Sequence, residues 1–272
     1  MFWTRLFSGI GLLVILAGLI YLGGDFLFAG TLLISLIGLF EFYRAIGIEK
    51  KYPGYVGYLT LIVYYLLLRF EVPFISIMLL WMTALFALLI HYVFTYPKVN
   101  IQEVALSFFG IFYVGVMLSH IYLLRMLPLG IYLVWIIFIC SWGCDTCAYC
   151  AGRLFGKHKM SPVLSPNKTV EGAIGGLLGV FLITALFCFI LKDTLGIHTT
   201  HIFGLSAVAA VAGFASMIGD LAASAIKRTY DIKDYGNLIP GHGGILDRFD
   251  SVIITAPIVY YLITIVLSGV EL

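Results

Sequence analysis

Four aspartates lie within or beside strongly apolar stretches of the chain and are its strongest candidates for chemistry: Asp145, Asp220, Asp247 and Asp250. Asp145 comes eight residues before Arg153, and Asp220 comes seven residues before Lys227; each basic residue follows the apolar stretch that holds the acid. Seven residues of helix rise roughly 10 Å, so both acids are expected about two turns below the same polar boundary. The last two are three residues apart and share a helical face. The spacing predicts that all four carboxylates reach a common depth.

Four acids without a matching excess of nearby cations would repel one another unless a bound cation neutralised them. Carboxylate oxygens are hard ligands of the kind that Mg²⁺ prefers, and Mg²⁺ often combines one or two carboxylates with substrate phosphates. The four aspartates therefore predict a metal site. The alternative, in which each acid caps a helix or pairs with a nearby Lys or Arg, stays open, above all for Asp250 near a helix start.

Basic and glycine-rich segments supply candidate phosphate ligands. In residues 164–172, Thr169 is the expected N-cap of a helix and Lys168 lies at the positive end of its dipole, an arrangement that favours anions. Lys227, Arg228 and Lys233 are expected to meet a polyphosphate. Residues 240–244 hold three glycines, which allow close approach of the backbone to a ligand, and His242, a candidate phosphate donor. Cations, glycines and carboxylates are the parts of a phosphoryl-transfer site.

The composition places these residues in a membrane protein. Of the 272 residues, 62% are hydrophobic and 11% are charged, whereas soluble domains are about 25% charged. These values exclude a disordered chain and a large soluble catalytic domain, and a net charge of +2 gives no basic field for nucleic acid. We predict an all-α polytopic integral membrane protein, with no nucleic-acid partner, and nine spans of suitable length at residues 6–22, 26–43, 54–70, 73–94, 105–125, 129–151, 171–191, 203–226 and 249–268.

The positions of lysine and arginine orient these spans. With a cytoplasmic N-terminus, 13 of the 16 Lys and Arg residues fall in cytoplasmic segments, as the positive-inside rule requires. Residues 1–104 form an N-terminal transmembrane region whose polar residues cluster at span ends. Residues 105–272 form a C-terminal transmembrane catalytic region, and the chemistry is expected on its cytoplasmic side.

Two other patterns in the second region are interpreted as packing. Glycines at 172, 175, 176 and 179 favour close approach of two helices. Cys140, Cys144, Cys147 and Cys150 imitate an iron–sulfur spacing, but they lie along a helical stripe, whereas a cluster needs a loop that wraps around it. We interpret these cysteines as small packing residues.

Three ordered motifs cover residues 140–250. The longest holds Ser224, Lys227-Arg228, Lys233-Asp234, Gly236, Pro240, His242-Gly243-Gly244, Asp247-Arg248 and Asp250. The other two are Asp145…Ala148-Tyr149…Gly152-Arg153…Gly156 and Ser165-Pro166-Asn167-Lys168-Thr169…Glu171-Gly172. Together they resemble the signatures of the phosphatidate cytidylyltransferases (CDP-diacylglycerol synthases). The N-terminal hundred residues share only hydrophobicity with that family.

The resemblance implies that CTP and phosphatidic acid react to give CDP-diacylglycerol and pyrophosphate. Catalytic roles then fall to Lys168, Asp220 and Asp247. The metal ligands are Asp145, Asp220, Asp247 and Asp250, holding Mg²⁺, with K⁺ as a candidate second cation. Substrate phosphates are expected to contact Arg153, Lys168, Lys227, Arg228, Lys233, His242 and Arg248. The lack of an obvious transit segment or cytosolic extension predicts a bacterial plasma (inner) membrane, and the positions of lysine and arginine predict an active site on its cytoplasmic side. A homodimer is a candidate assembly.

Two alternatives remain open from the sequence. A secondary transporter would use Asp145 and Asp220 to bind a coupling ion, but it predicts broken helices near the midplane and balanced repeats. A CTP-dependent polyprenol kinase shares the nucleotide and the membrane setting but moves the γ-phosphoryl group. The identity of the product made from CTP distinguishes these functions.

Overall fold

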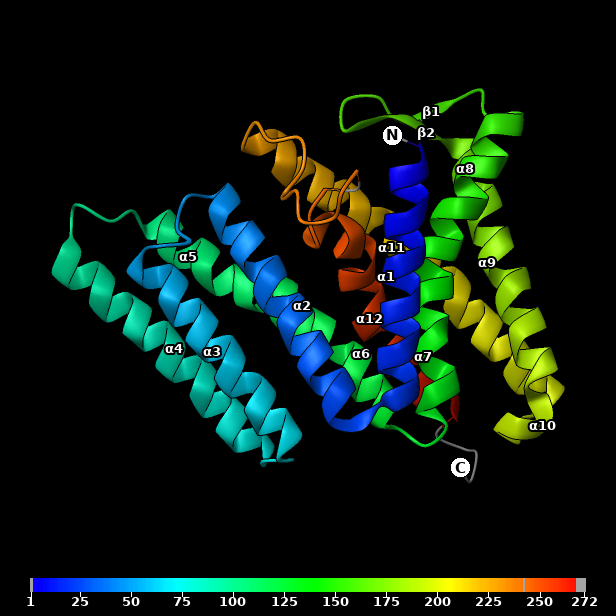
Figure 1. Cartoon of the computed structure of the whole chain (residues 1–272), viewed down its shortest axis with the longest axis horizontal. Helices are drawn as coiled ribbons and strands as arrows, with labels where there is room; N and C mark the ends of the chain where they lie inside the picture. The colour runs from blue at the N-terminus through cyan, green and yellow to red at the C-terminus, as the bar shows by residue number, and fades with distance from the viewer. Residues whose placement is uncertain (1, 242, 268–272) are drawn as a thin grey trace. The chain divides into compact units, whose positions relative to one another are not determined.

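The computed structural model describes residues 2–241 and 243–267, which are mostly helical, and it confirms the all-α polytopic fold class (Figure 1). The chain forms two compact units. The first contains the residues up to Ser119 together with Tyr230–Arg248, and the second contains His120–Thr229 together with the residues from Phe249 onward. The predicted division into residues 1–104 and 105–272 was based on where polar residues enter the spans and not on packing, so these units do not test it. It stays a prediction.

The first unit contains the N-terminal helices. Consecutive helices from α1 to α4 pack side by side, and α5 packs on α3 and α4. Their bounds are α1 (Phe2–Leu22), α2 (Gly24–Ala45), α3 (Tyr52–Arg69), α4 (Phe74–Thr95) and α5 (Ile101–Gly110), followed by the π-helical segment η1 (Ile111–Val116).

A buried cluster of hydrogen bonds holds α2 in place within this unit. The Tyr43 hydroxyl donates to the Ser107 carbonyl over 2.6 Å, and the Ser107 hydroxyl donates to the Pro53 carbonyl over 2.6 Å. Gly57 leaves room for the Tyr43 ring. Polar groups among apolar helices are costly unless they are paired, so these contacts set the position of α2 against α3 and α5.

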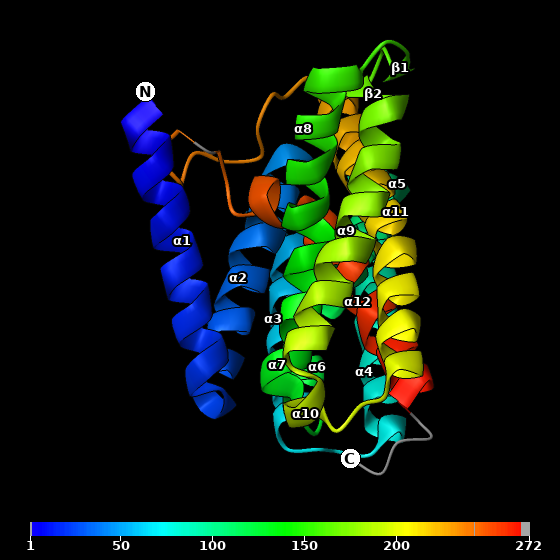
Figure 2. The same cartoon turned by 90° about the vertical axis from the view of Figure 1, so that its right-hand side faces the viewer.

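The second unit is centred on α9. Helix α8 makes its most extensive contact with α9, and α9 also packs along α11 (Figure 2). The bounds are α6 (Met117–Met126), α7 (Gly130–Phe138), the π-helical segment η2 (Ile139–Gly143), α8 (Cys144–Phe155), β1 (Lys159–Ser161), β2 (Ser165–Thr169), α9 (Val170–Ile190), α10 (Lys192–Leu195), α11 (Thr199–Thr229) and α12 (Leu246–Leu267).

The glycines of α9 allow this close packing, as predicted. A Cβ atom at Gly175 would meet the Cβ of Ala151, and one at Gly179 would meet the sulfur of Cys147. The interpretation of Cys147 as a packing residue is therefore confirmed. Cys140 and Cys144 are buried free thiols, whereas Cys150 is exposed.

The link between α8 and α9 is folded more than the sequence indicated. It contains a two-stranded antiparallel sheet in which Lys159 pairs with Thr169 and Ser161 pairs with Ser165. Glu171, in the first turn of α9, accepts backbone N–H bonds from Lys157 over 3.0 Å and His158 over 3.2 Å. The carboxylate thus ties the start of the hairpin to the start of α9.

Each of the nine predicted spans coincides with a helix, although the number of membrane crossings stays a prediction. Within the described residues, seven helices are long and apolar enough to cross a membrane. The described apolar part of α1 is shorter, at Phe7–Leu22, and α3 is not one of the seven. The cytoplasmic location of the N-terminus also stays a prediction.

The close contact between α8 and α9 predicts different effects of alanine at two glycines. Gly175→Ala should lower the thermal unfolding midpoint in detergent, because overpacking costs about 1–3 kcal/mol. Gly18→Ala in α1 should leave the midpoint unchanged or raise it, because its Cβ meets nothing within 4 Å and alanine favours helix. Equal midpoints for the two variants would contradict this packing.

Candidate active site

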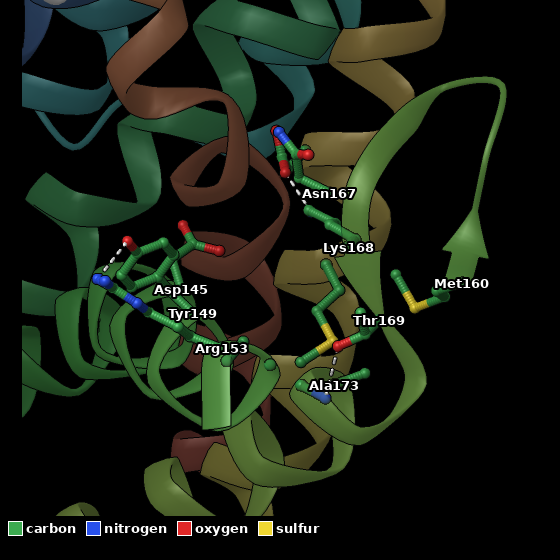
Figure 3. Close-up of a pocket in the computed structure, with 13 residues that line it drawn as sticks. Asp145, Tyr149, Arg153, Met160, Asn167, Lys168, Thr169 and Ala173 are labelled. Atoms are coloured by element: carbon green, nitrogen blue, oxygen red, sulfur yellow. Dashed lines mark hydrogen bonds and ion pairs between the residues drawn. The ribbon is translucent and has the colours of Figure 1, made fainter. Parts of the chain in front are cut away.

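A cavity of about 590 Å³ lies within the second unit, between α8, the β1–β2 hairpin, α9 and α11. Figure 3 shows Asp145, Tyr149 and Arg153 of α8 on one side of it and Asn167 and Lys168 of the hairpin on the other. This volume is typical of small-molecule sites. The lining residues are Asp145, Ala148, Tyr149, Gly152, Arg153, Met160, Asn167, Lys168, Thr169, Gly172, Ala173, Met217 and Asp220.

An ion pair joins two of the predicted catalytic residues across this cavity. The ammonium of Lys168, near the end of β2, contacts the carboxylate of Asp220 on α11. The two side chains are 24% and 26% exposed and both line the cavity, and the Nζ atom of Lys168 is itself buried against Asp220. The pair places one positive and one negative group side by side at the wall of the cavity.

The start of α9 is formed as the sequence predicted. The hydroxyl oxygen of Thr169 accepts the backbone N–H of Gly172 over 3.1 Å and caps the helix. Lys168 immediately precedes this cap, and the positive end of a helix dipole favours anions. The cap therefore positions Lys168 at the cavity.

A second polar stripe comes from α8. Asp145, Tyr149 and Arg153 are spaced four residues apart, and all three line the cavity. The guanidinium of Arg153 donates to the Tyr149 hydroxyl over 3.4 Å (Figure 3). The π-helical segment η2 directly precedes α8, and such segments often occur at functional sites. The stripe gives the cavity a cation and an acid on one helix face.

Asp250 extends this group of charges within the second unit. Its side chain is 9% exposed, and it accepts the backbone N–H of Ser251 over 2.8 Å. Its carboxylate lies within electrostatic range of Asp220, Asp145 and Lys227. The second unit thus brings together three of the four predicted acids and three predicted phosphate ligands, Arg153, Lys168 and Lys227.

Comparison with known proteins places this site in a family. The model of the Cytidylyltransferase family matches residues 3–266. The chain belongs to this family. The resemblance drawn from the three motifs is thereby confirmed, and the match extends through the N-terminal region, where the sequence motifs were absent.

Several curated relatives of this family member cover nearly the whole chain. The phosphatidate cytidylyltransferase of Staphylococcus haemolyticus is 33% identical over 96% of this chain and 98% of that protein. The protein of the same name from Bacillus subtilis is 32% identical, over 86% and 88% of the two chains. That of Synechocystis is 30% identical over 97% of both chains.

Asp247 lies in the first unit. Its carboxylate binds backbone N–H groups of the loop that precedes α12. Its Oδ2 atom accepts the backbone N–H groups of Tyr235 over 2.8 Å, Gly244 over 3.0 Å and Gly236 over 3.4 Å. The side chain is 6% exposed. These bonds give Asp247 a clear structural role, and its predicted roles as catalyst and metal ligand stay predictions.

The remaining predicted phosphate ligands are distributed over both units. Lys227 is half-buried and Arg228 is exposed, both in the last turn of α11. In the first unit, Lys233 is exposed and Arg248 is half-buried. His242 lies outside the described residues.

The acids of the second unit suit Mg²⁺ by the chemistry of their oxygens. No group of three or more His, Cys, Asp or Glu side chains that could hold a metal is found in residues 2–241 and 243–267. Mg²⁺ needs only one or two carboxylates when substrate phosphates complete its shell, so Asp220 with Asp145 or Asp250 is a sufficient donor set. The predicted four-aspartate ligand set remains a prediction.

Sequence reasoning missed Glu41, a buried acid of α2. Its side chain is 3% exposed, and its carboxylate accepts the backbone N–H groups of Ile245 and Leu246. The polar residues of the N-terminal region had been assigned to span ends, which left Glu41 without a role. The rule that was applied to the four aspartates, that an acid in an apolar segment is functional by default, would have identified it.

The cap of α9 can be tested by removing its hydroxyl. Thr169→Ala should lower the stability of the protein by about 1 kcal/mol, the usual cost of losing an N-cap. Thr169→Ser retains the hydroxyl oxygen and should preserve most of the stability. Thermal unfolding in detergent measures both variants, and an equal loss in the two would show that the cap does not hold this helix start.

Proposed function

We propose that the chain is a phosphatidate cytidylyltransferase, which transfers CMP from CTP to phosphatidic acid in phospholipid biosynthesis. The observation that carries the proposal is the agreement of family and relatives over nearly the whole chain. The cavity supports it with cationic groups for phosphates and acids for a metal ion. The products are CDP-diacylglycerol and pyrophosphate.

The reaction needs no side-chain nucleophile. A phosphate oxygen of the lipid, already ionised at neutral pH, forms a bond to the α-phosphorus of CTP. The bond between that phosphorus and the oxygen leading to the β-phosphate breaks, and pyrophosphate leaves with the electron pair. The protein must therefore bring two anions together and stabilise negative charge on the transferring and departing groups.

The residues of the cavity suit these tasks. Lys168 and Arg153 present cations to phosphate oxygens from opposite sides of the cavity (Figure 3). The ammonium of Lys168 is already held by Asp220, so its position is set before the nucleotide arrives. Lys227, Arg228, Lys233, His242 and Arg248 complete the proposed phosphate ligands.

Metal dependence is part of the proposal. Asp250 lies in electrostatic range of both Asp220 and Asp145. These three acids would hold Mg²⁺ in the second unit, and Asp247 is the further proposed ligand. The bound ion would neutralise charge that develops on the phosphates. K⁺ is the proposed second cation, and its ligands are not assigned.

The proposed location is a bacterial plasma membrane, with the active site facing the cytoplasm, where CTP is available. Seven apolar helices in the described residues support a multi-pass membrane protein, and the relatives named above are bacterial. A homodimer is the proposed assembly, and light scattering of the purified protein in detergent would test it.

Product identity tests the function. The purified protein should convert labelled CTP and phosphatidic acid into a CDP-lipid and pyrophosphate. Formation of CDP with a phosphorylated polyprenol, when that alcohol is supplied, would instead identify a kinase. An absence of any product from CTP, with ion-coupled uptake in vesicles, would identify a transporter.

Replacing Asp220 should stop turnover while leaving the fold intact. Asp220→Asn keeps the shape but removes the charge that positions Lys168 and a cation, and we expect CMP transfer to fall by roughly 100-fold or more. Asp25→Asn is the matched control, because Asp25, at the start of α2, forms an exposed ion pair with Arg69, at the end of α3. Its turnover should equal that of the unmodified protein.

Lys168→Met provides an independent test of the same pair and should also lose turnover. Each variant is compared after gel filtration, so that only monodisperse protein is assayed. Full turnover by Asp220→Asn would contradict the assignment of the cavity as the active site.

A further inference from the structure

Two buried carboxylates hold the loop that leads into α12 within the first unit. Asp247 accepts three backbone N–H groups of this loop. Glu41 accepts the next two, from Ile245 over 3.2 Å and from Leu246 over 2.8 Å. The backbone N–H groups of Gly244, Ile245 and Leu246, at the start of α12, thus all donate to carboxylate oxygens.

Glu41 is unusual as a helix cap because it comes from a distant helix. The first N–H groups of a helix usually bond to a local Ser, Thr, Asp or Asn. Here the cap lies 204 and 205 residues away in sequence, on α2. Asp247 reaches back to the N–H of Gly244, as the acidic partner of a capping box does, and Glu41 supplies the bonds that a local cap would otherwise make.

The loop is shaped to accept the Glu41 side chain. A Cβ atom at Gly236 or Gly244 would touch the Glu41 carboxylate oxygens. One turn further along α2, the guanidinium of Arg44 donates to the Tyr235 carbonyl over 2.5 Å. Helix α2 therefore holds both the beginning and the end of the segment 235–246.

The bonding pattern requires two acceptor oxygens at this position. Ile245 donates to Oε1 and Leu246 donates to Oε2, so both oxygens must accept. A glutamine has one amide oxygen and one NH₂ group, and it would direct a donor at one of the two N–H groups. A buried donor left without an acceptor is costly.

We propose that Glu41 is a positioning residue for CMP transfer, which acts by fixing the start of α12 and, through it, the carboxylate of Asp247. This inference rests on the proposed function and on the predicted role of Asp247. Asp247 directly follows Leu246, whose N–H Glu41 binds. Displacement of this turn would move the Asp247 carboxylate away from its position.

The kinetics of single and double variants of Glu41 and Asp247 distinguish a positioning role of Glu41 from a general effect on folding. In monodisperse protein, Glu41→Gln should lower kcat for CMP transfer about 10-fold or more, with KM for CTP changed less than threefold, as expected for a misplaced group that acts in the transition state. Glu41→Ala should lose more than Glu41→Gln. Glu41→Gln combined with Asp247→Asn should be no slower than Asp247→Asn alone, whereas independent structural damage would multiply the two losses.

Hydrogen exchange provides a readout that does not depend on turnover. The amides of residues 244–247 should exchange faster in Glu41→Gln than in the unmodified protein. Glu103→Gln is the matched control, because Glu103 forms its ion pair with Lys51 in the same unit, and it should change neither exchange in this segment nor kcat.

The outcomes distinguish the two proposals. Normal kcat for Glu41→Gln in a protein that makes CDP-diacylglycerol would overturn the role of Glu41 and leave the proposed function standing, as would losses that multiply with those of Asp247→Asn. Failure of the unmodified protein to make CDP-diacylglycerol would overturn the proposed function and with it the role of Glu41 in that reaction.

Discussion

A carboxylate held among apolar helices must be paired with a cation or with hydrogen-bond donors, because its desolvation is otherwise too costly. Acids in both units of this protein meet that constraint. Asp220 is paired with Lys168, and Asp247 and Glu41 are satisfied by backbone N–H groups. Each acid is thus paired and held in place.

The surrounding elements serve these contacts. Small residues let α8 and α9 approach closely, which places the polar stripe of α8 beside the start of α9. The Thr169 cap and the Glu171 carboxylate then hold the hairpin that carries Lys168. In the first unit, the Tyr43 and Ser107 hydrogen bonds fix α2, the helix that presents Glu41. Packing and capping together make the charged groups rigid.

Much of this could be read from the sequence, because helices, caps and glycine-mediated packing depend on local patterns. The helix positions, the Thr169 cap, the close packing at Gly175 and the family itself were predicted in this way. Local patterns also predicted that Asp145 and Asp220 lie near the same polar boundary, and both line the same cavity.

Two features could not be predicted because they depend on distant partners. The strands of the hairpin are short and polar, and one contains Pro166, so they lack the alternating apolar pattern of a half-buried strand. The hairpin is held by the carboxylate of Glu171, which follows β2 in the chain and accepts backbone N–H groups that precede β1. The bonds of Glu41 to Ile245 and Leu246 join residues more than 200 positions apart, and no local spacing encodes such a pair.

The proposed function requires that Asp220 and its neighbouring acids hold a cation that joins a nucleotide to a lipid headgroup. The most direct measurement is the anomalous signal of Mn²⁺ in crystals grown with CTP. The account predicts a peak roughly 2 Å from a carboxylate oxygen of Asp220, with the triphosphate beside Lys168. A peak elsewhere, or bound CTP with no metal near Asp220, would contradict it.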